Sequence, residues 1–424
     1  MLPVQQERNY VDPCNMRVLA FTTVFPNAVR PQHGLFVLER LRHCAKLAEI
    51  RVVAPRPFYP WPAMRAVPQS EVQGGLPVEH PVFRYLPRFG KSLDGLFLYA
   101  STRRAVRRLR CEFDFDLIDA HFGYPDGYAA VLLGRSLGRP VVVTLRGTEP
   151  LVAAAGPSRR RALAWALRNA DRIIAVSHPL AEGARELMAE YGPAQGAPMV
   201  EVIANGVDTA RFTPGVAEEE RRALGLPIEG KLIVSVGHLS PRKGFQRVLR
   251  VLPEVLRAVP DARFAIVGGA GAEGDNGPEL RELAARLGLS ERVVFAGPQP
   301  PGLVASWLRA ADLFVLASNH EGCPNVVWEA LACGLPVVAT RVGEVDRMVP
   351  DFAGMTFGQA DDAPALRTAL IEGLTRPYDR VAIRRWAERH TWTGVADRVF
   401  EQWASVLAPR RAQGWGAMTQ GIAA

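Results

Sequence analysis

The stretch EGCPNVVWEALACGLPVVAT, residues 321–340, places two glutamates eight positions apart among almost uncharged neighbours. Glu321 precedes a tight Gly-Cys-Pro-Asn turn, and Glu329 follows valines and a tryptophan. Burying an unpaired carboxylate is costly, so each acid needs a partner. An ionised carboxylate only accepts hydrogen bonds, and a vicinal diol of a sugar or ribose donates two. The alternative is that Glu321 complements a helix dipole and that Glu329 is exposed to solvent.

A phosphate site is expected between the two glutamates. Pro324 suits the first turn of a helix, and the free amides at a helix start preceded by glycine attract anions. A ligand with phosphates between two polyol rings, which is a nucleotide sugar, fits the whole stretch. The residues expected around its phosphates are Gly322, Cys323, Pro324, Asn325 and Val326.

A basic loop, HLSPRKGFQ (238–246), follows the apolar run KLIVSVG. Arg242 and Lys243 enter a helix there, and lysine is scarce in this arginine-rich chain. Cations at this point would stabilise the negative charge that develops on a diphosphate leaving group. The alternative is a solvated surface pair.

Short apolar runs alternate with amphipathic helical patterns along the chain. The runs that predict strands lie at 16–22, 50–54, 82–86, 115–120, 140–145, 171–177, 231–237, 263–268, 292–297, 312–318 and 335–340. Strands that are apolar throughout, with a helix after each, indicate parallel sheets covered on both faces. The sequence therefore predicts the α/β class, with two doubly wound, Rossmann-like domains whose ligands bind beyond the carboxyl ends of the strands.

The domain boundaries are expected near turn-rich segments. The joint falls in NGVDTARFTPGV (205–216), which has turn residues and no periodicity. The expected organisation is a flexible segment 1–15, a first domain 16–207, a second domain 208–390, a crossover helix 391–407 and a loose tail 408–424.

Three ordered motifs, SVGHLSPRKGF, ANGVDTARF and EGCPNVVWEALACGLPVVAT, resemble the retaining glycosyltransferases of family 4, which have the GT-B fold. HFGYPDG (121–127) and VTLRGTE (143–149) resemble a branch that makes bacterial exopolysaccharides and teichuronic acid. The resemblance spans roughly residues 16–407. It implies a nucleoside-diphosphate-sugar donor on the second domain, a glycan or lipid-linked acceptor on the first, C-terminal helices that cross back, and neither metal nor cofactor.

The resemblance also implies roles for single residues. Glu321 contacts the donor sugar and Glu329 holds the ribose hydroxyls. The family's arginine, followed five residues later by lysine, maps onto His238 and Lys243. Because a histidine replaces the arginine, either Arg242 supplies the missing charge or His238 does so when protonated.

In the first domain, the resemblance implies that His121 touches the donor sugar near the reacting carbon, and a satisfied loop histidine is the alternative. Gly34 follows the first strand and opens a helix, where a bare backbone can approach phosphate, although a plain turn glycine fits as well. The RGTE loop, with Arg146, Thr148 and Glu149, is expected to face the acceptor. Catalysis is thus assigned to Glu321, His121 and Lys243.

Two metal or cofactor signals are discounted. Asp114 and Asp116 form a D-x-D pattern, but they lead straight into a strand and read as its solvated start. Glycines 269, 271 and 274 match a dinucleotide fingerprint, but a long loop separates them from the next helix.

The composition limits compartment and partners. The 424 residues carry a net charge of +8, five scattered cysteines, no apolar run of membrane-spanning length and no apolar leader. Unpaired cysteines suit a reducing cytoplasm. The basic and aromatic residues expected to dock on an anionic membrane face, as opposed to a merely solvated arginine surface, are Arg103, Arg104, Arg107, Arg108, Phe58, Tyr59 and Trp61. Nucleic acid is not expected, because no recognised binding module is present.

Two rival functions are compatible with this pattern. A nucleotide-sugar epimerase of the same fold would need an acid and a base flanking the sugar ring, and it would form product from donor alone. A non-catalytic protein that binds nucleotide sugars or glycans would show neither transfer nor slow donor hydrolysis.

Overall fold

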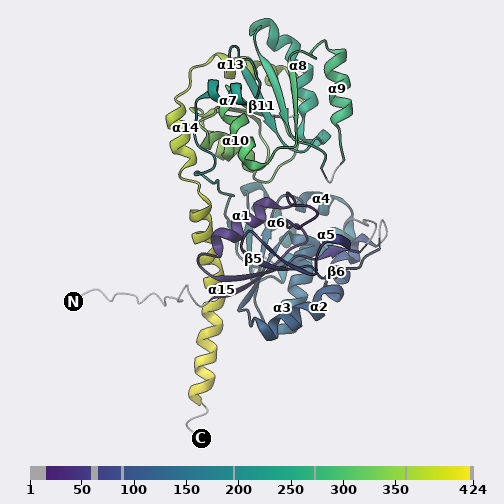
Figure 1. The fold of residues 1–424 in the computed structure, drawn as a ribbon. Helices are drawn as coiled ribbons and strands as arrows, with labels where there is room; N and C mark the ends of the chain where they lie inside the picture. Colours follow the sequence, from purple (N-terminus) through teal and green to yellow (C-terminus); the bar gives the residue numbers. More distant parts are fainter. Residues whose placement is uncertain are drawn as a thin grey trace, which may run out of the picture. The chain divides into compact units, whose positions relative to one another are not determined.

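The computed structural model describes residues 16–58, 65–86, 90–193, 196–271, 274–358 and 361–420, with side chains to residue 408. The chain forms two compact units (Figure 1). Unit 1 comprises Met1–Ile203 and Val395–Ala424, and unit 2 comprises Ala204–Gly394. These divisions differ by a few residues from the expected boundaries at 207 and 390. The segment 1–15, expected to be flexible, lies outside the described residues.

Unit 1 is built on an eight-stranded sheet of order β10-β9-β8-β7-β1-β2-β5-β4. Its parallel strands include β1 (Arg17–Phe21), β2 (Glu49–Val53), β7 (Leu117–His121), β8 (Val141–Leu145), β9 (Arg172–Ala175) and β10 (Val200–Val202). Its helices are α1 (Leu35–Cys44), α2 (Asp94–Glu112), α3 (Tyr128–Leu137), α4 (Glu149–Ala154), α5 (Pro157–Arg168) and α6 (His178–Glu190). Every residue of β7 and β8 is buried, as expected for strands covered on both faces.

One edge of this sheet differs from the expectation. β4 (Ser70–Gln73) and β5 (Leu76–Glu79) form an antiparallel hairpin, and the apolar run 82–86 gives only β6 (Val82–Phe83), which pairs with β3 (Arg56–Pro57) in a separate two-stranded sheet. The placement of 82–86 in the main sheet was therefore wrong. The hairpin lacks a continuous apolar run because an edge strand exposes alternate residues, and its signal was the Gly74-Gly75 turn.

Unit 2 has a six-stranded, fully parallel sheet of order β13-β12-β11-β14-β15-β16. Its strands are β11 (Leu232–Val236), β12 (Arg263–Val267), β13 (Val293–Gly297), β14 (Leu313–Leu316), β15 (Val337–Thr340) and β16 (Gly354–Phe357). Its helices are α7 (Ala217–Ala223), α8 (Phe245–Ala258), α9 (Gly277–Arg286), α10 (Pro301–Ala310), α11 (Asn325–Ala332), α12 (Val345–Met348), α13 (Ala363–Thr375) and α14 (Arg380–Ala387). The strand order reverses between β11 and β14, which is the topological switch point of such sheets.

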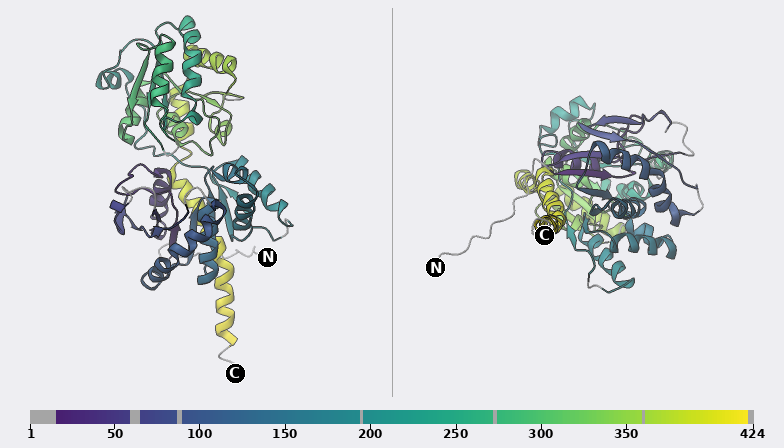
Figure 2. Two further views of the ribbon diagram at one scale, coloured as in Figure 1. Left: turned by 90° about the vertical axis from the view of Figure 1, so that its right-hand side faces the viewer. Right: turned by 90° about the horizontal axis from the view of Figure 1, so that it is seen from below.

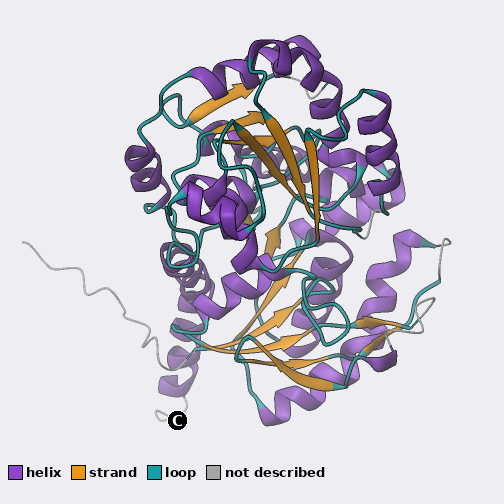
Figure 3. Cartoon of the chain, turned by 45° about the horizontal axis from the view of Figure 1, so that its top comes forward, coloured by secondary structure: helices purple, strands orange, loops and turns teal. Residues whose placement is uncertain are grey.

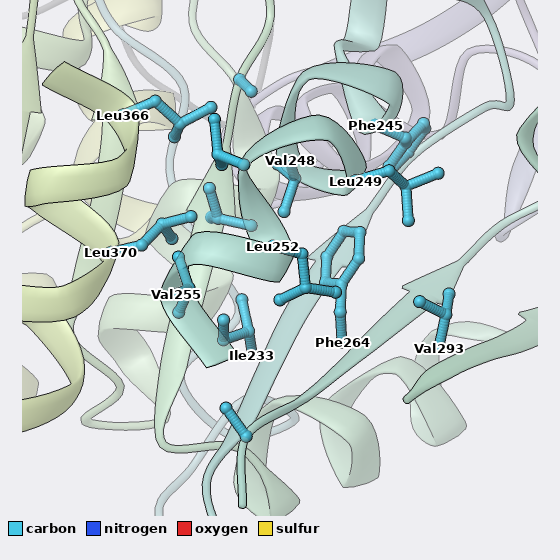
Figure 4. Close-up of a cluster of buried hydrophobic side chains, with 14 of the residues drawn as sticks. Ile233, Phe245, Val248, Leu249, Leu252, Val255, Phe264, Val293, Leu366 and Leu370 are labelled. Atoms are coloured by element: carbon cyan, nitrogen blue, oxygen red, sulfur yellow. The ribbon is translucent and has the colours of Figure 1, made fainter. Parts of the chain in front are cut away.

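The core of unit 2 includes side chains of both strands, among them Ile233 of β11 and Val315 of β14. Leu252 and Val255 of α8 and Leu370 of α13 lie beside Ile233 of β11 and Phe264 of β12 (Figure 4). These side chains are fully buried, and each such apolar group contributes about 1.5–3 kcal/mol. The tight packing leaves the polar loops after β11 and β14 at defined positions. The doubly wound α/β architecture predicted for both units is confirmed (Figures 2 and 3).

The last helix links the two units along the chain. α15 (Trp392–Gln420) begins within unit 2 and belongs to unit 1 from Val395 onward, where Trp403 is fully buried. This confirms the expected return of the C-terminal segment to the first domain. The helix extends past residue 408, where the loose tail was expected to begin.

Candidate active site

Two charged residues meet at the switch point of unit 2. Lys243 ends the 3-10 turn Pro241–Lys243 that follows β11, and Glu321 follows β14, the neighbouring strand. The Lys243 ammonium donates to Glu321 Oε1 over 2.7 Å, and Arg242 Nη1 lies 3.6 Å from the same oxygen. The structure therefore brings together three of the predicted donor-site residues.

The Glu321 carboxylate is held ionised. Its side chain is 10% exposed, and burial by itself would raise its pKa. The Lys243 charge and hydrogen bond, together with the Arg242 charge, outweigh burial and lower the pKa below its ordinary value. An ionised acceptor with some exposed surface is what a sugar hydroxyl requires.

The two loops that carry the pair are bonded to each other. The amide of Asn319 donates to the Arg242 carbonyl over 3.0 Å, and Arg242 Nη1 donates to the His320 carbonyl over 2.8 Å. Gly244 precedes α8 with φ 77°, and an added Cβ would lie 1.9 Å from the Ala317 carbonyl oxygen. Only glycine allows this close approach, so the loops are fixed by backbone contacts.

The loop before α11 is anchored through its carbonyls. The Glu344 amide donates to the Gly322 carbonyl over 2.9 Å, and Asn205 Nδ2 donates to the Cys323 carbonyl and to Asn325 Oδ1. Pro324 is the residue before α11, so the first amides of that helix begin at the predicted anion site. Asn205 was not predicted as a site residue, although it stands in the ANGVDTARF motif and could have been found there.

Glu329 and His238 are two further residues that the sequence predicts for the donor site. Glu329 is half-buried in α11, next to Trp328, whose ring stacks on His390 with centroids 4.1 Å apart. His238 is exposed, and a Cβ on Gly271 would come 2.8 Å from the His238 Cβ. The glycine loop after β12 therefore packs against His238, and residues 268–276 separate β12 from α9, unlike a dinucleotide fingerprint.

In unit 1, His121 is the last residue of β7 and is fully buried. Arg146 Nη2 lies 2.8 Å from His121 Nδ1, and His121 Nε2 lies 3.6 Å from Asp119 Oδ2. A guanidinium can only donate, so Nδ1 accepts and the ring is neutral with its hydrogen on Nε2. Burial and the charges of Arg146 and Arg40 lower the pKa of His121 well below its ordinary value.

Both units of the chain are similar in sequence to known proteins. Residues 33–211 match the profile of Glycosyltransferase Family 4, and residues 216–390 match that of Glycosyl transferases group 1. A relative from Bacillus subtilis, named as the teichuronic acid biosynthesis glycosyltransferase TuaC, is 32% identical over 91% of this chain and 93% of its own. The chain belongs to the family 4 glycosyltransferases.

Other similarities of this glycosyltransferase agree with that membership. A D-inositol 3-phosphate glycosyltransferase of Acidothermus cellulolyticus is 32% identical over 81% of this chain and 80% of its own. The crystal structure of Anabaena Alr3699/HepE in complex with UDP covers 92% of this chain and all of that chain, with a TM-score of 0.68 and 20% identity. At that identity the similarity shows the GT-B fold alone.

The buried cluster of the glycosyltransferase around His121 contains two residues that sequence reasoning missed. Arg40 of α1 is 1% exposed, and its three guanidinium nitrogens have no hydrogen-bond partner among the described residues. Burial raises the pKa of Asp119 to about 6, against the charges of Arg40 and Arg146. Arg40 stands in the amphipathic helical run LFVLERLRHC, and Asp119 stands in the strand run FDLIDA, so the sequence pattern explains each as part of its element.

The other residues predicted for the site in the first domain differ in burial and in their contacts. Gly34 precedes α1 with φ 78°, and a Cβ there would lie 2.5 Å from the Val24 carbonyl oxygen, so this position requires glycine. Thr148 is exposed. Glu149 is buried and accepts hydrogen bonds from the amides of Gly123, Arg146 and Gly147, so it holds its own loop together. The acceptor contacts predicted for Arg146 and Glu149 are not favoured by this burial.

The described residues contain no group of three or more histidine, cysteine or acidic side chains able to hold a metal ion. In the D-x-D pattern, Asp116 accepts a hydrogen bond from the Arg17 amide and Asp114 pairs with Arg139. Both acids thus hold neighbouring segments of unit 1 together. No helix in the described part of the chain is long and apolar enough to span a bilayer.

Proposed function

We propose that this glycosyltransferase moves a sugar from a nucleoside diphosphate to a glycan or lipid-linked acceptor, with retention of anomeric configuration, in cell-surface polysaccharide biosynthesis. The observation that carries the proposal is the Lys243–Glu321 pair, 2.7 Å apart at the switch point of unit 2 and adjacent to the amide end of α11. Solved structures of the same fold hold UDP and UDP-glucose, which supports the donor class. The teichuronic acid role in the name of the Bacillus relative supports the pathway class.

Each part of the donor is assigned to protein groups that suit its charge and its hydrogen-bonding capacity. Glu321 accepts hydrogen bonds from the donor sugar, and Glu329 accepts them from the ribose diol. The backbone N–H groups of residues 322–326, except Pro324, which has none, face the diphosphate. The growing negative charge of the diphosphate is stabilised by Lys243 together with Arg242 or His238. The role of Lys243 is twofold, because it also keeps Glu321 ionised.

Transfer with retention needs a substitution on one face of the sugar. The bond from the anomeric carbon to the diphosphate oxygen breaks as the bond to the acceptor oxygen forms on the same face. The acceptor hydroxyl proton passes to the departing diphosphate oxygen. Each cation at the leaving group therefore acts in the transition state, and neither a metal nor another cofactor is part of this proposal.

The acceptor is proposed to lie at an anionic membrane surface, on the cytoplasmic side. Arg103, Arg104, Arg107 and Arg108 are all exposed on α2, and Phe58 is 53% exposed. Cations beside exposed aromatic groups favour an anionic lipid surface. Tyr59 and Trp61, expected in the same surface, lie outside the described residues.

The experiment that tests the function combines donor selection with product analysis. Purified protein is screened by thermal shift against UDP- and GDP-sugars, and the stabilising donor is incubated with and without a polyprenyl-diphosphate saccharide. Transfer with an unchanged anomeric configuration in the NMR spectrum, and only slow hydrolysis without acceptor, is expected. Epimerised donor in the absence of acceptor, or binding without any turnover, would contradict the proposal.

A further inference from the structure

Unit 1 contains a cavity that the donor site does not use. Its volume is about 240 Å³, and its lining follows β1, β2, β3 and β6. β1 and β2 end at the carboxyl edge of the parallel sheet, where ligands of such domains bind. The side chains that give the cavity its character are Arg30, His33, Arg56, Lys91, Phe83 and Tyr85.

The charged groups of this cavity are mostly cationic. Arg30, Arg56 and Lys91 carry permanent positive charge, and His33 adds one when protonated. The carboxylate in the lining, Asp94, lies 3.3 Å from the Lys91 ammonium and offsets one cation. Among the residues that line the cavity, positive charge therefore exceeds negative charge, which favours an anionic ligand.

The cavity also offers an aromatic wall. The rings of Phe83 and Tyr85 lie with their centroids 5.0 Å apart, and the Lys91 ammonium lies 4.5 Å from the Tyr85 centroid. Such a wall provides apolar surface for the C–H face of a sugar ring, while the polar groups fix its orientation. Aromatic and cationic groups therefore meet at Lys91.

The cationic groups are held on ordered backbone. Asn27 Oδ1 accepts hydrogen bonds from the amides of Val29 and Arg30, and the Arg30 carbonyl accepts one from the His33 amide. Arg56 pairs in register with Val82 through β3 and β6. A site whose charges are positioned before binding loses less entropy when the ligand enters.

We propose that this cavity is the acceptor subsite and that it takes one sugar residue carrying a phosphate or a carboxylate. The inference rests on the proposed transferase function and specifies its acceptor. The anionic group meets Arg30, Arg56 and Lys91, and the sugar ring lies against Phe83 and Tyr85. The volume of the cavity is somewhat below the range of about 300–1,000 Å³ for small-molecule pockets. A single charged sugar therefore fits better than a long oligosaccharide.

The test is direct binding of glucose 6-phosphate, glucuronate, glucose and inorganic phosphate to the full chain, measured by saturation-transfer NMR and calorimetry. At least one of the two charged sugars should bind tenfold or more tightly than glucose and than phosphate, and the better one identifies the anionic group. Lys91→Met and Arg56→Gln should each weaken that binding at least tenfold. Lys46→Met, at an exposed position of unit 1, should leave it unchanged.

UDP binding, measured in parallel, separates this inference from the donor site. The cavity variants should bind UDP as the wild type does, which also shows that they are folded. Glu329→Gln should weaken UDP binding and keep the charged sugar. Equal affinity for glucose, no binding of either charged sugar, or binding that Lys91→Met and Arg56→Gln leave intact would overturn the acceptor assignment, whatever the outcome for UDP.

Discussion

The ammonium of Lys243 lies 2.7 Å from Glu321 Oε1, although 78 residues separate the two in the chain. Each follows one of the two strands at which the sheet order of unit 2 reverses. The pair therefore occupies the point where the fold itself opens a ligand site. In the proposed function, the pair couples the group assigned to the donor sugar to the group assigned to the leaving phosphate.

Replacing Lys243 by Met should lower kcat by about 10²–10³-fold, because a preorganised charge at the leaving group is lost. Lys243→Arg should retain more activity, since the charge remains. The variant Glu321→Gln should also lose turnover. Because the residues act together, the Lys243→Met/Glu321→Gln double variant should lose much less than the product of the single losses, measured as kcat at saturating donor. Strict multiplicativity would show that the two act independently.

Replacing Glu329 by Gln should raise the donor KM about tenfold or more with little change in kcat, because a charged acceptor for the ribose diol is lost. The wild type should discriminate against a donor with a 2′,3′-dideoxyribose, whereas Glu329→Gln should discriminate much less. Initial rates with the two donors measure this directly. A variant that retained the full discrimination would place the ribose elsewhere.

Replacing Gly244 by Ala should destabilise the protein more than the same change at Gly288. Both glycines have positive φ, 77° and 69°, which costs an alanine about 1–2 kcal/mol. At Gly244 the new methyl would also come within 1.9 Å of the Ala317 carbonyl oxygen, whereas Gly288 has open space. The free energies of unfolding in urea should therefore differ clearly between the two variants. An equal loss of stability in both would mean that the loop at Gly244 relaxes easily.

Replacing Asp126 by Asn should flatten the pH dependence of stability. Burial raises the pKa of Asp126 to about 7, against hydrogen bonds from the Thr23 amide and hydroxyl. The folded state thus binds more protons than the unfolded state between pH about 4 and about 7, and this carboxyl makes stability fall as the pH rises through that window. Asparagine can keep both Thr23 contacts, so its Tm should decline less from pH 5 to pH 8. A parallel decline in both proteins would argue against this titration.

The bond from Arg146 to His121 should keep that imidazole neutral. With ¹⁵N-labelled histidine, the His121 resonances should show a hydrogen on Nε2 and no protonation through the pH range in which an ordinary histidine titrates, since its pKa is well below the ordinary value of 6.5. The folded state then takes up no proton there, so the group lowers stability as the pH falls below 6.5. In Arg146→Met, loss of the adjacent charge should move the pKa upward. A cationic ring at pH 7 would refute the assigned tautomer.

The pattern of the sequence was sufficient to predict the strands of unit 2 that carry the proposed donor site. The apolar runs before Lys243 and Glu321 located β11 and β14, because strands buried on both faces leave continuous apolar runs. The edge hairpin of unit 1, formed by β4 and β5, was not predicted, because its strands alternate more exposed with more buried residues and therefore lack a continuous apolar run. Asn205 and Arg40 were missed for another reason, because each acts on residues distant in the chain. Asn205 donates a hydrogen bond to the Cys323 carbonyl, and the charge of Arg40 acts on Asp119.

By itself, the sequence determined the α/β class, the alternation of strands and helices, and which polar residues follow which strands, since these depend on local periodicity and turn chemistry. Only the tertiary structure decided that Lys243 and Arg242 converge on one oxygen of Glu321, that Glu149 binds its own loop, and that His121 is buried against Arg146. Strand order and side-chain packing set those distances, and both arise from contacts between residues far apart along the chain.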